Sequence, residues 1–95
     1  MELAVIGCGY VGLVSGACLA SLGHRVIGVD TDAERIAQLQ AGRVPIYEPG
    51  LAELIAAQTR QKRLRFTTDT TSAVHAAGVI FIAVGTPPPT TAAQT

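Results

Sequence analysis

Three closely spaced glycines near the amino terminus constrain this chain more than any other feature. The apolar stretch Glu2–Ile6 predicts a strand, and Gly7-Cys8-Gly9-Tyr10-Val11-Gly12 follows it at once. A helical apolar pattern over Tyr10–Leu22 comes next, and a second predicted strand, Arg25–Val29, ends in Asp30. Strand, glycine turn, helix, strand and acid are the parts of a dinucleotide site, in the order that such a site needs.

Each glycine has a physical role in that interpretation. Gly7 lets the chain turn tightly out of the strand, Gly9 leaves room between backbone and pyrophosphate, and Gly12 lets the helix pack closely on the strand. The helix then directs its free N–H groups at the phosphates. Asp30 would accept hydrogen bonds from the adenosine ribose, which favours NAD over NADP. The alternative is a tight strand–helix turn in which Asp30 is only a cap.

Length and composition indicate one small globular domain. The chain has 95 residues, of which 48% are hydrophobic and 15% charged, with a formal net charge of +0. A complete dinucleotide domain has two halves, so we expect a truncated one, with four strands. The apolar segments are too short for a membrane span, and the start lacks the basic residues of a signal peptide. Cys8 and Cys18 are expected to be unpaired in a reducing cytoplasm.

The remaining pattern predicts further helices and strands of the same kind of fold. Helix 32–40 would begin with a capping box of Thr31 and Glu34. Arg35 could contact the adenosine or be a solvated helix arginine, and the sequence leaves both open. The other expected elements are helix 51–58, strand 64–67, helix 70–77 capped by Asp69, and the apolar strand 79–84, which is typical of a central parallel strand.

Two segments leave functional alternatives. The run 59–65 carries four basic residues, but no aromatic residue is interleaved, so a solvated helix end is favoured over a nucleic-acid site. Thr86 follows the carboxyl end of the last strand, where doubly wound sheets bind ligands, and so is expected to touch the cofactor; a plain strand-end turn is the alternative. Residues 1–88 are taken as the domain and 89–95 as a flexible tail. No residue is singled out as catalytic or as a metal ligand.

The motifs together resemble the UDP-glucose/GDP-mannose dehydrogenase family, and within it the UDP-glucose 6-dehydrogenases. The resemblance rests on four segments in order, MELAVIGCGYVGLVSGACLASLGHRVIGVD, VPIYEPGL, RLRFTTD and VIFIAVGTP, and covers Met1 to about Pro88. It implies a Rossmann-type doubly wound α/β sheet, first half only, with strand order 3-2-1-4. The residues that match the family's NAD contacts are Gly7, Gly9, Tyr10, Val11, Gly12, Asp30, Arg35 and Thr86.

The resemblance also implies a chemistry. Enzymes of this family oxidise the C6 hydroxyl of a nucleotide sugar twice with two NAD, through a cysteine thioester. The expected function is therefore the NAD-binding part of an enzyme that converts UDP-glucose to UDP-glucuronate, in a homo-oligomeric parent. The family's catalytic residues would lie beyond residue 95, so this chain alone is expected to be inactive. The alternatives are a dehydrogenase for GDP-mannose or UDP-N-acetylmannosamine, and a non-catalytic NAD-binding module.

Overall fold

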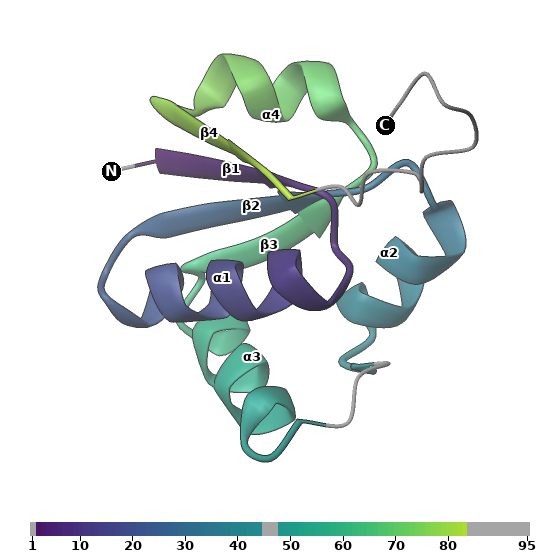
Figure 1. The fold of residues 1–95 in the computed structure, drawn as a ribbon, viewed down its shortest axis with the longest axis vertical. Helices are drawn as coiled ribbons and strands as arrows, with labels where there is room; N and C mark the ends of the chain where they lie inside the picture. The colour runs from purple at the N-terminus through teal and green to yellow at the C-terminus, as the bar shows by residue number, and fades with distance from the viewer. Residues whose placement is uncertain (1, 45–47, 84–95) are drawn as a thin grey trace, which may run out of the picture.

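A four-stranded parallel sheet forms the centre of the computed structural model, which describes residues 2–44 and 48–83. The strands lie in the order β3-β2-β1-β4 (Figure 1), as the sequence predicts. Val84, Thr86 and the tail 89–95 lie outside the described residues. The elements, in chain order, are β1 (Glu2–Ile6), α1 (Tyr10–Ser21), β2 (Arg25–Val29), α2 (Ala33–Gln40), α3 (Leu51–Arg60), β3 (Leu64–Thr67), α4 (Thr70–Ala76) and β4 (Val79–Ile82).

Helices cover both faces of the sheet, which is why the strands carry apolar residues on both sides. In Figure 1, α4 lies on one side, while α1 and α3 lie on the other. The larger core joins Leu3 and Val5 of β1 to apolar residues of α1, α2 and α3. A smaller core on the opposite face joins Ala4 and Ile27 to Ala73 of α4. The glycine turn follows the carboxyl end of β1, at the edge of the sheet where folds of this kind bind ligands.

The central strand pair is held in full register. β1 pairs with β2 from Glu2↔Arg25 to Ile6↔Val29, so the residues that follow each strand lie side by side. Gly7 follows β1 and Asp30 follows β2. The glycine turn and the acid, 23 positions apart in the chain, are therefore neighbours at the same edge of the sheet because the strands are parallel.

One expectation about the elements was wrong. Asp32, not Thr31, is the N-cap of α2, and its carboxylate accepts hydrogen bonds from the N–H groups of Glu34 and Arg35. Thr31 is exposed in the turn that precedes this cap. β4 is the edge strand that the predicted order requires, and it exposes all four of its apolar residues because nothing in the described residues pairs with its outer side.

The ends of several other helices and strands differ slightly from those predicted from the sequence. α3 continues to Arg60, which places one of the predicted basic residues in the last helical turn, where it suits the helix dipole. Gly23, with φ of 104°, follows the end of α1 in the left-handed conformation that glycine favours. No helix within residues 2–44 and 48–83 combines the length and apolar character needed to cross a membrane.

Candidate cofactor site

The glycine turn is tight, and the fold itself requires two of its glycines. Gly7 has φ of 105°, a conformation that favours glycine, and its N–H donates to the Val29 carbonyl at 2.6 Å. A Cβ placed on Gly12 would overlap the Gly7 carbonyl oxygen. Gly12 therefore allows α1 to approach the turn, as the sequence predicts.

Gly9 is different, because the protein does not fill the space beside it. A Cβ at Gly9 would meet no heavy atom within 4 Å. Gly9 is also the N-cap of α1, with no side chain to accept from the helix N–H groups and no acid in the first turn. Among the described helices only α1 lacks both a capping side chain and an acidic residue in its first turn. An open, positively polarised helix start with room beside it fits a phosphate group.

Asp30 lies directly beside this turn and is already held by three donors. Its Oδ2 accepts from the Cys8 N–H at 2.9 Å and from Nη1 of Arg35 at 3.2 Å, while its Oδ1 accepts from the Asp32 N–H at 2.9 Å. Burial alone raises the pKa of Asp30. The three donors outweigh that effect, so the pKa lies below its ordinary value. The carboxylate is thus charged, and it joins the ends of β1, β2 and α2.

Arg35 is the charged partner of this acid. It lies in the first turn of α2 and forms an ion pair with Asp30, with its side chain 40% exposed against 13% for Asp30. The sequence left a solvated arginine and an adenosine contact equally open. The structure brings Arg35 to the predicted ribose-binding acid, so it is not a freely solvated side chain.

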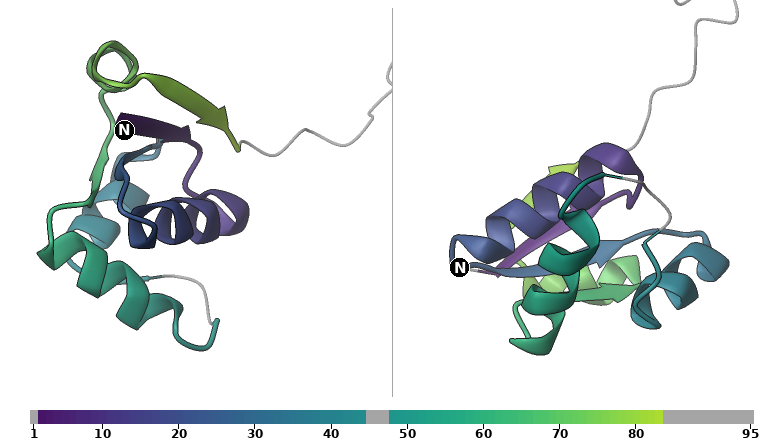
Figure 2. Two further views of the ribbon diagram at one scale, coloured as in Figure 1. Left: turned by 90° about the vertical axis from the view of Figure 1, so that its left-hand side faces the viewer. Right: turned by 90° about the horizontal axis from the view of Figure 1, so that it is seen from below.

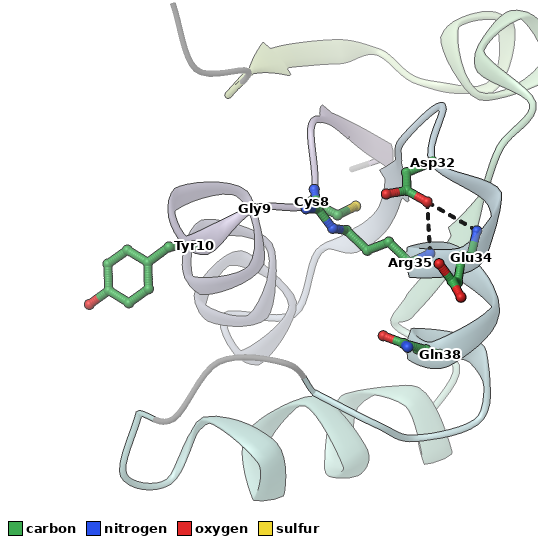
Figure 3. Close-up of a pocket in the computed structure, with 7 residues that line it drawn as sticks. All are labelled: Cys8, Gly9, Tyr10, Asp32, Glu34, Arg35 and Gln38. Carbon is green, nitrogen blue, oxygen red and sulfur yellow. Dashed lines mark hydrogen bonds between the residues drawn. The ribbon is translucent and has the colours of Figure 1, made fainter.

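A hollow of about 370 Å³ separates the start of α1 from α2. In Figure 3, the Arg35 side chain extends across it toward Cys8, and the two hydrogen bonds to the Asp32 carboxylate cap α2 at its rim. The hollow is lined by Cys8, Gly9, Tyr10, Asp32, Glu34, Arg35 and Gln38.

Two of the predicted contact residues lie away from Asp30. The Tyr10 ring points away from Arg35 (Figure 3) and its hydroxyl donates to Oε1 of Glu48 at 3.1 Å. This hydrogen bond raises the pKa of Tyr10, and the negative charge of Glu48 adds to the rise. Val11 is 60% exposed at the start of α1 and does not line the hollow. Thr86 lies outside the described residues, so its predicted contact stays a prediction.

Sequence reasoning missed two residues that shape the site. A Cβ on Gly28 would come within 2.8 Å of the Phe66 ring and 3.2 Å of the Cys8 sulfur. Gly28 thus lets Cys8 pack under the turn, and a glycine inside a strand is a sequence signal of such close approach. The second is Cys8, whose N–H positions Asp30. Burial, together with the negative charge of Asp30, raises the pKa of the Cys8 thiol to about 12, and Arg35 opposes the rise.

Known proteins resemble this chain in sequence and in fold. The model of the UDP-glucose/GDP-mannose dehydrogenase family, NAD binding domain, matches residues 1–94. A UDP-glucose 6-dehydrogenase of Rhizobium meliloti is 53% identical over 87 residues, which are 92% of this chain and 20% of that protein. The chain thus spans about a fifth of the length of the curated relatives it matches.

Solved structures of dehydrogenases superpose on the fold. A GDP-mannose dehydrogenase from Pseudomonas aeruginosa, solved as a ternary complex, matches with a TM-score of 0.90 and 43% identity, over 95% of this chain and 21% of that one. A UDP-glucose dehydrogenase from the archaeon Pyrobaculum islandicum matches with a TM-score of 0.87 and 47% identity, over 92% and 20%. The chain belongs to the UDP-glucose/GDP-mannose dehydrogenase family, whose NAD-binding domain it represents.

Proposed function

We propose that this chain binds the adenosine and pyrophosphate parts of NAD for a dehydrogenase that oxidises UDP-glucose to UDP-glucuronate. The observation that carries the binding part is the uncapped start of α1 beside Asp30. UDP-glucose is favoured over other sugars by the 53% identity to a UDP-glucose 6-dehydrogenase. A GDP-mannose dehydrogenase is the second candidate, supported by the TM-score of 0.90.

Each residue of the site has a defined role in this proposal. The N–H groups at the start of α1 would hold the pyrophosphate, with Gly9 leaving room for its approach. Asp30 would accept hydrogen bonds from the ribose hydroxyls, and the Cys8 and Asp32 N–H groups would keep its carboxylate in place. Tyr10 and Val11, which open α1, and Thr86 are proposed as the further contacts. When bound, NAD supplies the hydride acceptor of the reaction.

The overall reaction consists of two two-electron oxidations of C6. The alcohol becomes an aldehyde and the aldehyde, with one water, becomes the acid, and each step reduces one NAD to NADH. No residue of this chain is assigned to these steps. We propose that the residues that perform these oxidations lie elsewhere in a longer protein. The segment matched here is only 20% of the Rhizobium meliloti relative.

The binding proposal is tested by calorimetric titration of the folded chain with NAD. We expect saturable binding, weakened by Asp30→Ala at least tenfold because hydrogen bonds between charged groups and hydroxyls each contribute about 1.5–3 kcal/mol. Arg43→Ala is a matched surface control, since Arg43 is exposed and does not line the hollow. A folded chain that binds no NAD would contradict the proposal.

The substrate proposal needs a different experiment. NADH formation by the longer protein that contains this chain would be followed with UDP-glucose and with GDP-mannose, because the substrate-binding part sets the sugar. Turnover with UDP-glucose supports the proposal, and turnover with GDP-mannose alone overturns it.

A further inference from the structure

The basic run 59–65, to which the proposed function gives no role, is not a single helix end. Only its first two residues belong to α3, while Lys62 and Arg63 form the turn that follows and Arg65 lies in β3. β2 and β3 are parallel neighbours, so their starts lie together, at the opposite end of the sheet from the glycine turn (Figure 1). The basic side chains of the run therefore gather away from the proposed cofactor site.

A hollow of about 750 Å³ lies at this end of the sheet. Arg25, Lys62, Arg63 and Arg65 line it, four of the seven basic residues of a chain with a formal net charge of +0, but only one acid does, Glu2. Glu2 forms an ion pair with Arg25 at 3.5 Å. The other three cations form no ion pair within residues 2–44 and 48–83. Their like charges repel one another around the hollow, and a bound anion would relieve that repulsion.

Lys62 has a backbone conformation that a lysine rarely adopts. Its φ is 62°, and it is the only residue other than glycine with a positive φ in the part of the chain that the structure describes. The equivalent positions after α1 and α2 are Gly23 and Gly42, with φ of 104° and 87°. In all three turns the N–H of this residue donates to the carbonyl three residues earlier, at 3.0 Å. A glycine would adopt this conformation with less strain, so the stability of the turn does not explain the lysine.

The lining of the hollow favours one class of anion. Guanidinium groups form parallel hydrogen bonds with phosphate oxygens, and a lysine adds a compact charge. Val26 and Ile27 also border the hollow but are each only 2% exposed, so it offers little apolar surface for a protein partner. None of the described residues that line it is aromatic, so a nucleic-acid base has no ring to stack on. Linked phosphate groups, which carry several charged oxygens and need no apolar contact, fit this lining.

We propose that this hollow, at the starts of β2 and β3, binds an oligophosphate anion of two or more linked phosphate groups, with Lys62, Arg63 and Arg65 as its ligands. An inorganic phosphate chain and a nucleoside triphosphate present the same oxygens and are the two sources of such a ligand. The hollow shares no lining residue with the one beside the glycine turn. The failure of this proposal would therefore leave the proposed NAD binding intact.

The test is a titration of the ¹⁵N-labelled chain with tripolyphosphate at constant ionic strength, followed at the backbone amides by NMR. We expect saturable shifts at residues 61–65 with a dissociation constant of about 1 mM or below. Sulfate should bind roughly tenfold more weakly, because one small ion reaches fewer of the cations. Shifts that do not saturate, equal binding of sulfate, or shifts confined to the start of α1 would overturn the proposal.

A parallel titration with ATP identifies the source of the phosphates. Equal dissociation constants for ATP and tripolyphosphate, read at the amides of residues 61–65, show that the phosphate chain alone is recognised. Tighter binding of ATP at the same amides identifies a nucleotide as the ligand. ATP shifts only at the start of α1, together with tripolyphosphate shifts at residues 61–65, leave an inorganic phosphate chain as the ligand.

The variant Lys62→Gly separates binding from stability. It removes the charge and relieves the strained φ, so the affinity for tripolyphosphate should fall roughly fivefold while the urea midpoint stays the same or rises. Arg63→Ala should weaken binding to a similar extent. Its matched control is Arg43→Ala, because Arg43 has the corresponding place after α2 but does not line the hollow, and this variant should change the dissociation constant less than about twofold.

Unchanged affinity in a folded Lys62→Gly chain would overturn the proposal, whatever its urea midpoint. This variant suffices even if Arg63→Ala fails to fold, since a glycine suits the backbone at that position.

Discussion

Two glycines in one turn, Gly9 and Gly12, serve different purposes. The fold needs Gly12, because a Cβ there would overlap the Gly7 carbonyl oxygen. The fold does not need Gly9, which faces open space in an extended conformation with φ of −79°. A glycine at a position where the protein has room for a side chain indicates a ligand that approaches the backbone closely.

This difference predicts opposite effects for the same substitution. Gly12→Ala should lower the free energy of unfolding by about 1–3 kcal/mol or more, because the turn must shift to make room. Gly9→Ala should leave the urea midpoint nearly unchanged but weaken NAD binding measured by calorimetry, since the methyl group enters the space proposed for the pyrophosphate. Unchanged NAD affinity in a folded Gly9→Ala chain would argue against that placement.

The two cysteines also differ in environment. Cys8 is 2% exposed beneath the glycine turn, and burial raises the pKa of its thiol to about 12, whereas Cys18 is exposed on α1. Only a thiolate is alkylated readily. Iodoacetamide at pH 8 should therefore modify Cys18 first and Cys8 only after denaturation, as read by peptide mass spectrometry. Fast modification of Cys8 in the folded chain would contradict the buried geometry.

Asp30 should make stability depend on pH. Its pKa is lower in the folded than in the unfolded chain, so it contributes fully above the unfolded value of about 3.9, and the contribution is lost as the pH falls through the folded pKa. Asp30→Asn should cost about 1–3 kcal/mol in urea unfolding at pH 7, and this difference should shrink toward pH 2. Glu53→Gln, in the exposed first turn of α3, provides the control. A pH-independent cost of Asp30→Asn would exclude the charge as its cause.

At the scale of elements, α2 shows how a local sequence pattern can be assigned to the wrong residue. Thr31 and Glu34 have the spacing of a capping box, yet α2 begins one residue later, at Ala33, and Asp32 is its cap. The Asp32 N–H is held by Oδ1 of Asp30. The start of α2 is therefore fixed by the end of β2, which the local pattern does not encode.

This assignment is tested by substituting each residue. Asp32→Ala should lower the free energy of unfolding by about 1 kcal/mol, within the range of 0.5–2 kcal/mol for a lost N-cap, because two N–H groups lose their acceptor. Thr31→Ala, its neighbour and matched control, should change stability by less than about 0.5 kcal/mol, as exposed positions without such contacts do. If Thr31→Ala lowered the free energy of unfolding more than Asp32→Ala in chemical denaturation, Thr31 would be the N-cap, as the capping-box pattern predicts.

At the scale of the whole molecule, the two edge strands of the sheet differ in character. β3 begins and ends among charged and polar residues, but β4 presents Val79, Ile80, Phe81 and Ile82 at its exposed edge, with Ile82 74% exposed. Figure 2 shows β4 with α4 beside one end of it and no other helix along it. An exposed apolar edge without charge or proline invites pairing with another strand.

The chain is therefore expected to self-associate through β4. Ile82→Lys should shift it toward the monomer in analytical ultracentrifugation, because a charge at an edge strand opposes strand pairing. Leu22→Lys is a closely matched control, since Leu22 is also 74% exposed but lies at the end of α1, away from that edge. A wild-type chain that stays monomeric at millimolar concentration would contradict the expectation.

The order of the elements, the parallel sheet β3-β2-β1-β4 and the kind of cofactor site could all be predicted from the amino-acid sequence. These follow from local causes: a glycine where φ is 105°, apolar periodicity, and strands that alternate with helices. The pairing of Arg35 with Asp30 and the room that Gly28 makes for Cys8 became evident only in the folded structure. The contact of Gly28 with Cys8 and Phe66 joins residues far apart in the chain, and Arg35, although only five residues from Asp30, has a long side chain that the local sequence leaves free to face solvent instead.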